Sequence, residues 1–411
     1  MTHPYRRLLR DRDLRTLWAG VTISSIGSEL YAFGAIWLAV SIAGADGGLI
    51  VTARFTTILV MSVAAGAFVD LLPRRTLLIG ADVVRATFSL LVVAVALTDD
   101  LSLGLLAATA MALSAAGTIY QPALQSGLPL LSPDPERLRE TNGLIDATTR
   151  IAQAIGPFLA AALVAILPVI HLLTLNAVSY LASAAAVLRM GHRFDEATPP
   201  ARQDFRKRLL RGLDAAHVCP GAWIILLTTG FRAGVVVLCC VVGIPLFFAQ
   251  SPTGGVSAAA FVIGMSAASE ILSNFLIVAR PIGSPWRFIF LGYGTIGAGV
   301  ALLGLAESFL TGLPLVAATA AAASLVGVGN SMAGIQMLTW FGSRLDAGDF
   351  AAILRLRLIL VTTAAAGSTA LGAWIFDAAG IAATTFLGGA LLLGAATFGI
   401  VSKTHRQGVP E

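Results

Sequence analysis

The residues of this sequence that could do chemistry are charged side chains inside long apolar runs. Glu29 lies about a dozen residues into the first run, and Glu270 lies in a run of the C-terminal half. A charge at membrane depth costs about 2.5–3.5 kcal/mol on insertion scales, and removing water from a carboxylate favours its protonated form. We expect Glu29 and Glu270 to take up and release protons. For each, permanent pairing with an arginine is the alternative.

Two further acids are each followed by an arginine on the same predicted helix face. Asp82 and Arg85 are three residues apart, and Asp146 and Arg150 are four apart. We favour local neutralising pairs near the inner end of the helices, which serve as structure or as a gate. A proton network that switches partners is the alternative, so Asp82 and Asp146 remain candidates for proton coupling.

Other intramembrane polar residues could bind a substrate. Arg232, about ten residues into its run, could bind an anionic group or pair with Glu29, and Glu270 could also pair with Arg232. A mostly apolar pocket with a few polar groups suits amphiphilic ligands, although each such residue alone is typical of helix packing. The cavity candidates besides Arg232 are Tyr120, Gln121, Gln125, Asn274, Asn330, Gln336 and Trp37.

The elements that must position these residues are membrane-spanning helices. The chain has 411 residues, of which 57% are hydrophobic and 12% charged, and its mean hydropathy is +0.85; soluble domains average about 25% charged residues. Spans need about 20 apolar residues, and lipid requires internal backbone hydrogen bonding. We predict an all-α membrane protein with twelve transmembrane helices at 16–43, 50–70, 76–98, 102–130, 141–167, 169–189, 222–249, 256–279, 288–308, 312–341, 350–376 and 380–401.

The distribution of charge predicts the orientation. If both termini are cytoplasmic, most of the 27 Lys and Arg residues fall at inside connections, with Arg355 and Arg357 flanking the one between the tenth and eleventh helices. The outside loops then carry acids, among them Asp100 and Glu307. We expect a multi-pass protein of the bacterial inner (plasma) membrane.

The longest connection divides the chain into two halves of six helices. We place the halves at 1–190 and 222–411, joined by a basic cytoplasmic linker at 191–221. Within the linker, residues 201–211 form a basic amphipathic pattern suited to an anionic lipid surface. A simple tether between the halves is an equally good interpretation.

Several function classes lack support in the sequence. The five histidines and three cysteines have no metal-ligand spacing, and no glycine loop followed by lysine could cradle phosphates. We therefore expect neither an enzyme nor an ATP-driven pump, no metal or other cofactor, no nucleic-acid partner, and a monomer. The expected partners are lipid, protons and a small-molecule substrate.

The connection after the second predicted helix carries a family resemblance. Residues Gly66, Asp70, Arg74 and Arg75 match the loop signature of the major facilitator superfamily, roughly G-x-x-x-D-R-x-G-R-R, whereas Leu71 and Pro73 depart from it. The resemblance implies that Asp70 contacts the start of the eleventh helix and steadies one access state.

The fifth predicted helix carries a second match. Gly156-Pro157 resembles the Gly-Pro signature of antiporter members, and together with Ser25-Ile-Gly27 and Asp82-Val-Val-Arg85 it is similar to the macrolide- and enterobactin-exporter branch. The resemblance implies two halves that alternate access to a central cavity, with proton-coupled export of an amphiphilic compound such as a siderophore or macrolide. Import or facilitated passage of a small metabolite is the alternative. The fourth helix carries no charge, unlike many proton antiporters of the family.

Overall fold

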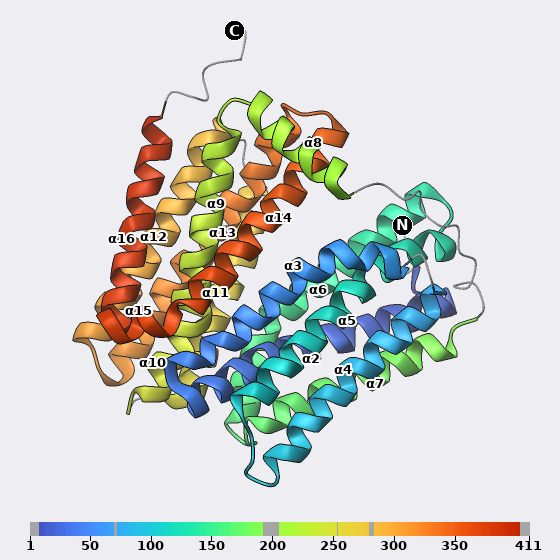
Figure 1. Ribbon diagram of the computed structural model, residues 1–411, viewed down its shortest axis with the longest axis horizontal. Helices are drawn as coiled ribbons and strands as arrows, with labels where there is room; N and C mark the ends of the chain where they lie inside the picture. The colour runs from blue at the N-terminus through green and yellow to red at the C-terminus, as the bar shows by residue number, and fades with distance from the viewer. Residues whose placement is uncertain (1–7, 70–71, 192–204, 253, 279–282, 403–411) are drawn as a thin grey trace. The chain divides into compact units, whose positions relative to one another are not determined.

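The computed structural model describes residues 8–69, 72–191, 205–252, 254–278 and 283–402, and all regular structure within them is helical (Figure 1). The helices are α2 (Arg12–Ala43), η1 (Gly44–Gly48), α3 (Leu49–Val69), α4 (Arg74–Ala96), α5 (Leu103–Leu131), α6 (Pro135–Val164), α7 (Ile170–Arg189), α8 (Phe205–Val218), α9 (Ala222–Val236), η3 (Val237–Gly243), α10 (Ile244–Gln250), α11 (Gly255–Val278), α12 (Pro285–Phe309), α13 (Gly312–Gly342), α14 (Ala347–Ala370), α15 (Gly372–Ala379) and α16 (Ile381–Val401).

Eleven stretches of the described chain are long and apolar enough to cross a membrane, against the twelve predicted. The difference lies at Arg12–Ser62, a stretch of 51 residues that includes α2 and most of α3. The short 3-10 helix η1 joins these two helices without an irregular loop. The chain is therefore a multi-pass membrane protein.

Most predicted helix ends agree with the structure within a few residues, and two helices are interrupted. The predicted helix 222–249 consists of α9, the π-helical turn η3 and α10. The predicted helix 350–376 divides at Leu371 into α14 and α15. Another helix, α6, starts earlier than predicted, because the Asp134 side chain accepts a hydrogen bond from the backbone N–H of Arg137 at 2.9 Å and caps it.

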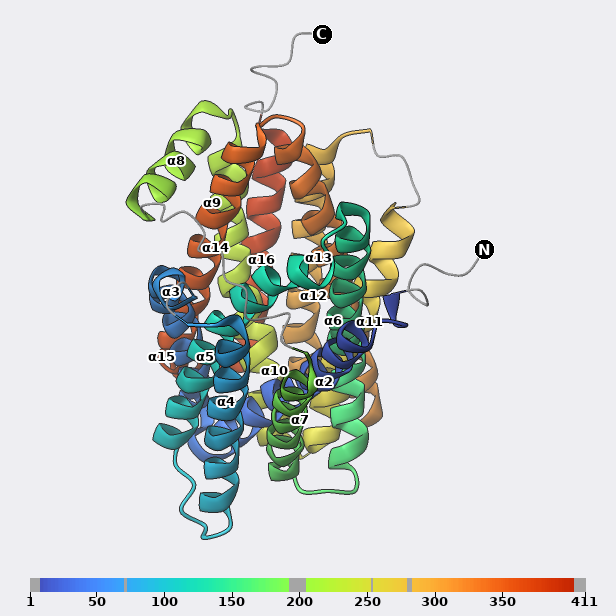
Figure 2. The same ribbon diagram turned by 90° about the vertical axis from the view of Figure 1, so that its right-hand side faces the viewer.

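The described chain forms two compact units. Unit 1 comprises residues 1–42 and 56–201, and unit 2 comprises residues 43–55 and 202–411. In unit 1, α4 packs between α5 and α7, as Figure 2 shows for α4 and α7. Glycines bring α2 close to α7: Gly20 packs against Ser183 and Ala186, and Gly27 packs against Ser179. Small residues at such spacing allow close helix packing in membranes.

Helix α12 is at the centre of unit 2, between α13 and α16. Two pairs of its glycines, each seven residues apart, face these neighbours. A Cβ at Gly292 or Gly299 would collide with the backbone of α13, whereas one at Gly297 or Gly304 would collide with that of α16. Substitution at any of the four requires the helices to separate.

The short segment Ala43–Phe55, which comprises the end of α2, η1 and the start of α3, belongs to unit 2. The Thr52 and Thr369 hydroxyls share a hydrogen bond at 2.8 Å, and Gly48 packs against the Val242 side chain. The first connection of the chain and the start of α3 are thus anchored to η3 and α14.

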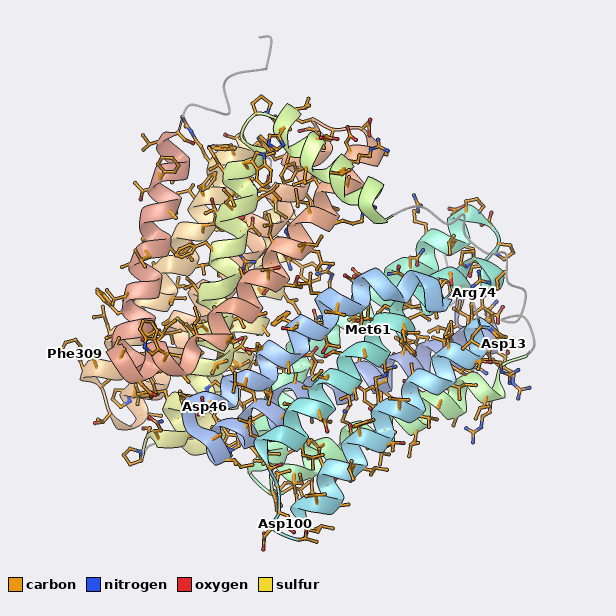
Figure 3. The ribbon with its side chains drawn as sticks, in the orientation of Figure 1. Asp13, Asp46, Met61, Arg74, Asp100 and Phe309 are labelled. Carbon is orange, nitrogen blue, oxygen red and sulfur yellow. The ribbon has the colours of Figure 1, made fainter. Side chains whose placement is uncertain are left out.

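The two ends of unit 1 differ in their labelled charges. Asp13 and Arg74 lie at one end, and Asp100 lies at the other (Figure 3). Arg74 and Arg75 begin α4, and Asp100 follows its last turn. This arrangement places the predicted inside and outside connections at opposite ends of the unit.

Helix α8 occupies the described part of the predicted linker and packs against α14 within unit 2. Arg211 bonds Asp349 at 2.6 Å and Asp346 at 3.4 Å. The hydrogen bond to Asp349 raises the pKa of Arg211. Gly212 packs against the Ala352 carbonyl. The helix is thus docked on α14 rather than free along its described length.

Candidate functional site

Unit 2 contains a polar cavity of about 230 Å³ among α9, α11, α12, α13 and α14. It brings together three of the predicted site residues, one from each of α9, α11 and α13. The lining residues are Thr229, Arg232, Glu270, Tyr293, Asn330, Ala333, Gly334, Met337 and Arg357.

A hydrogen-bond chain connects the three predicted residues. Arg232 Nη1 donates to Asn330 Oδ1 at 2.5 Å, and Asn330 Nδ2 donates to Glu270 Oε2 at 3.4 Å. The amide of Asn330 thus bridges a guanidinium and a carboxylate from two other helices. A side-chain amide can do this because it offers both an acceptor and a donor.

A second polar contact closes the wall of the cavity. The Thr229 and Tyr293 hydroxyls are 2.6 Å apart, and Tyr293 is fully buried. The Thr229 hydroxyl also lies 2.6 Å from the Ile225 carbonyl of the preceding turn. These contacts fix the Tyr293 ring beside the cavity.

The cavity lies deep along its helices. Arg232 is ten residues beyond the start of α9, and Arg357 is ten residues beyond the start of α14. At about 1.5 Å per residue this is roughly 15 Å, half of a hydrocarbon core of about 30 Å. Gly230 of α9 packs against Leu360 of α14, so Arg357 lies about 7 Å nearer the start of these helices than Arg232 does.

Arg357 is a cavity residue that the sequence analysis missed. We expected it to flank the connection before α14, but it lies well inside that helix and lines the cavity. Its Nε is buried and has no hydrogen-bond partner among the described residues. A helix cap at Asp346 could have revealed its position, because Arg357 then lies about three turns inside the helix. The Asp346 side chain accepts a hydrogen bond from the backbone N–H of Asp349 and caps the start of α14.

Two other predicted cavity residues of unit 2 lie outside the lining set. Asn274, one turn beyond Glu270, accepts a hydrogen bond from the Ser331 hydroxyl at 2.7 Å, and so ties α11 to α13. Gln336 is buried within α13. Both are positioned as helix-packing residues.

In unit 1, Asp82 and Arg85 form a buried ion pair on α4. The Arg85 guanidinium lies 4.3 Å from the centre of the Tyr120 ring and 4.4 Å from that of Tyr180. Stacking on both rings stabilises the cation where water is absent. Tyr120, predicted to line a cavity, is buried and packs against Arg85.

Glu29 and the Gly-Pro step lie together in unit 1. Gly156 has no side chain, and a Cβ at this position would overlap the Cβ of Glu29. Glu29 itself is half-buried, whereas Gly156 and Pro157 are buried within α6. The sequence predicted these residues independently, and the structure places α2 and α6 in contact at both.

The remaining helix candidates of unit 1 lie near or at its surface. Asp146 and Arg150 form an exposed pair at 2.8 Å, and Gln121 and Gln125 are exposed on α5. Trp37 is half-buried on α2, where its ring lies 6.3 Å from that of Phe33.

The structure describes only part of the loop signature between α3 and α4. Asp70 lies outside the described residues, and Gly66 lies in α3. Arg74 Nε donates to the Ser126 hydroxyl at 2.8 Å, and Arg75 donates to the Leu188 carbonyl at 2.7 Å. The two arginines thus tie the start of α4 to α5 and α7.

Glu307 is not in a loop as predicted. It lies in the last turn of α12, and its Oε2 is buried with no hydrogen-bond partner in the described part of the chain. The predicted helix 288–308 already included this position, so its assignment to the outside loop was wrong. In the same described residues, no three His, Cys, Asp or Glu side chains are grouped as metal ligands.

Three solved structures illustrate the similarity of the fold. A bacterial homologue of the iron transporter ferroportin, in an inward-facing state, is 14% identical with a TM-score of 0.71, covering 95% of this chain and 99% of its own. An auto-inhibited peptide transporter of the POT family is 10% identical with a TM-score of 0.76 and 98% coverage of both chains. The nucleoside transporter NupG is 12% identical with a TM-score of 0.68, covering 93% and 98%.

Sequence comparison is consistent with this likeness. No curated protein matches the chain. The family model of the Major Facilitator Superfamily matches residues 17–354, most of the chain. Family and fold together indicate a transporter rather than an enzyme. The chain therefore belongs to the Major Facilitator Superfamily, as the resemblance of its motifs predicted.

Proposed function

We propose that this protein is a secondary-active transporter that uses the proton gradient to export a small amphiphilic compound. The observation that carries the proposal is the hydrogen-bond chain from Glu270 through Asn330 to Arg232 on the wall of the unit 2 cavity. A carboxylate and a guanidinium at this depth are expensive to keep in a membrane protein, and such residues mark substrate paths and proton relays.

The hydrogen bonds from Glu270 through Asn330 to Arg232 could couple proton binding to ligand binding. When Glu270 binds a proton it attracts Asn330 less strongly, and the amide is freer to turn away from Arg232. In unit 1, Glu29 is the second candidate for proton binding, and its contact with Gly156 joins it to the Gly-Pro step of α6. Asp82 and Asp146, which form ion pairs with Arg85 and Arg150, are the further candidates.

Export rests on the resemblance of the N-terminal half to the macrolide and siderophore exporters. Import or facilitated passage of a small metabolite is the second candidate, and the charges that line the cavity favour it. A proton on Glu270 leaves the positive charge of the arginines less compensated, so a proton and an anionic substrate would bind together and move in one direction.

We also propose that the protein works as a monomer in the bacterial inner membrane with both termini cytoplasmic. The basic residues at one end of the chain's helices and the acids at the other support this orientation. The docked helix α8 would then lie at the cytoplasmic surface, where basic residues meet anionic lipid.

Transport by reconstituted vesicles tests the proposal. Purified protein is placed in vesicles loaded with enterobactin or erythromycin, and efflux is followed with and without an imposed pH gradient. We expect the gradient to accelerate wild-type transport, and we expect Glu270→Gln and Glu29→Gln to lose this acceleration. Accumulation instead of efflux would support the importing alternative.

Asp100→Asn is the matched control, since it removes one carboxylate from the end of a helix connection. It should respond to the gradient as the wild type does. If Glu29→Gln and Glu270→Gln both respond normally too, the assignment of proton coupling is wrong.

A further inference from the structure

We propose that Arg357 and Arg232 together form a binding site for an anionic group, a carboxylate or a phosphate, carried by the substrate. The inference rests on the proposed function only in taking the cavity as the substrate site. It narrows the anionic group expected at Arg232 to a carboxylate or a phosphate, and it adds a binding residue, Arg357, on a helix for which the sequence predicted none.

The two guanidinium groups line the same cavity from adjacent helices. Arg232 comes from α9 and Arg357 from α14, and these helices pack together within unit 2. Two arginines that share one cavity repel each other. Such an arrangement is stable when an anion lies between them, because a planar guanidinium can donate two parallel hydrogen bonds to a carboxylate or phosphate.

Both arginines keep N–H donors that a ligand could use. Arg232 donates from Nη1 to Asn330, but a guanidinium has five N–H donors in all. Arg357 has its Nε buried and without a partner among the described residues. A buried charged donor without an acceptor is costly, and an incoming oxygen would remove that cost.

The charges lining the cavity are unequal. Among its described lining residues there are two arginines and one carboxylate, Glu270, so the site carries one excess positive charge when all three are ionised. The bridge through Asn330 places the acid on the side of Arg232. The excess positive charge of the lining favours an anionic ligand over a neutral one.

The cavity has room for such a group. Its volume of about 230 Å³ equals the share of roughly seven or eight water molecules in the liquid, at about 30 Å³ each. A carboxylate or phosphate with part of its hydration fits within this space. The Tyr293 and Thr229 hydroxyls on the wall offer further polar contacts.

Anion-dependent stability of the purified full-length protein in detergent tests the inference without any transport. The midpoint of thermal unfolding is measured against rising potassium phosphate or potassium citrate, with potassium chloride at equal ionic strength as reference. We expect at least one of the two anions to raise the wild-type midpoint above the chloride reference. Arg232→Gln and Arg357→Gln should require at least about tenfold more anion for the same half-maximal shift.

Two other variants sharpen the test. Arg355→Gln removes the same charge from an exposed position of α14, two residues away, and should keep the wild-type response. Glu270→Gln removes the competing carboxylate and should lower the anion concentration needed. If Arg357→Gln does not fold, Arg357→Lys keeps the charge but loses the paired donors, and should also weaken the response.

The inference is overturned if neither anion stabilises the wild type beyond chloride. It is also overturned if Arg357→Gln lowers the midpoint equally at every anion concentration, since that is the behaviour of a purely structural arginine. In either case proton-driven efflux from vesicles could still be observed, so failure here is distinct from failure of the proposed function.

Discussion

At the scale of single residues, the Asp82–Arg85 pair shows how the protein keeps a charge in its interior. The carboxylate is fully buried, and the guanidinium lies between two tyrosine rings. Asp82→Asn should destabilise the protein by about 3–5 kcal/mol, because it leaves Arg85 buried without a counter-charge. A double variant with Arg85→Gln should recover part of the loss, as measured by unfolding in detergent.

The exposed pair on α6 is the natural comparison for this prediction. Asp146→Asn removes a partner from Arg150 in an ion pair that is open to the surroundings, so its effect should stay within about 1 kcal/mol. Equal losses at Asp82 and Asp146 would contradict the role of burial.

Asp11 makes the stability of the first helix depend on pH. Burial raises its pKa, but hydrogen bonds from the backbone of Leu14, from Arg137 and from the backbone of Asp13 together lower it below the ordinary 3.8. A lowered pKa gives stability that is present above about pH 4 and is lost as the pH falls through the folded-state value. The stability difference between wild type and Asp11→Asn should therefore narrow below pH 4. A difference unchanged at pH 3 would exclude this linkage.

Some residues of the unit 2 cavity could be predicted from the sequence, and others could not. Glu270, Asn330 and Arg232 could be chosen because a polar side chain inside an apolar run is conspicuous. Arg357 escaped because it follows a charged connection, where an arginine is expected. The sequence suggested a direct pair between Glu270 and Arg232 but not the bridge through Asn330, because Asn330 lies 98 residues from Arg232 and 60 residues from Glu270.

At the scale of helices, packing depends on glycines that touch a neighbour. Gly156→Ala should destabilise unit 1, because the added methyl group would overlap Glu29 on α2. Gly80 and Gly117 are matched controls with no atom within 4 Å of an added Cβ, and alanine there should leave stability unchanged or raise it by up to about 1 kcal/mol. Thermal unfolding in detergent measures all three. Equal effects at the three positions would refute the contact.

Helix existence was predictable, and helix continuity was not. Long apolar runs between charged connections fix where each helix lies, as the near-identity of 312–341 and α13 illustrates. The apolar runs continue through the π-helical turn η3 and through the break at Leu371, so hydropathy does not reveal either feature. Both lie where η3 and α15 contact η1 and other helices of unit 2, which sequence patterns do not reveal.

At the scale of the whole molecule, the separation of charges predicts which ends face which compartment. Single cysteines are introduced at Asp13 and Asp100, which lie at opposite ends of unit 1 (Figure 3), in a protein whose three native cysteines are replaced. An impermeant maleimide should label the Asp100 site in intact cells and the Asp13 site only after permeabilisation. Labelling of both in intact cells would contradict the orientation.

The anchoring of Ala43–Phe55 in unit 2 has a consequence for how the protein is made. Thr52 bonds Thr369, which the ribosome adds 317 residues later. At about 5–20 residues per second, this segment waits roughly 15–60 s for its partner. During that time the segment lacks the contacts that α14 provides. Its packing into unit 2 is therefore completed only after α14 has been made.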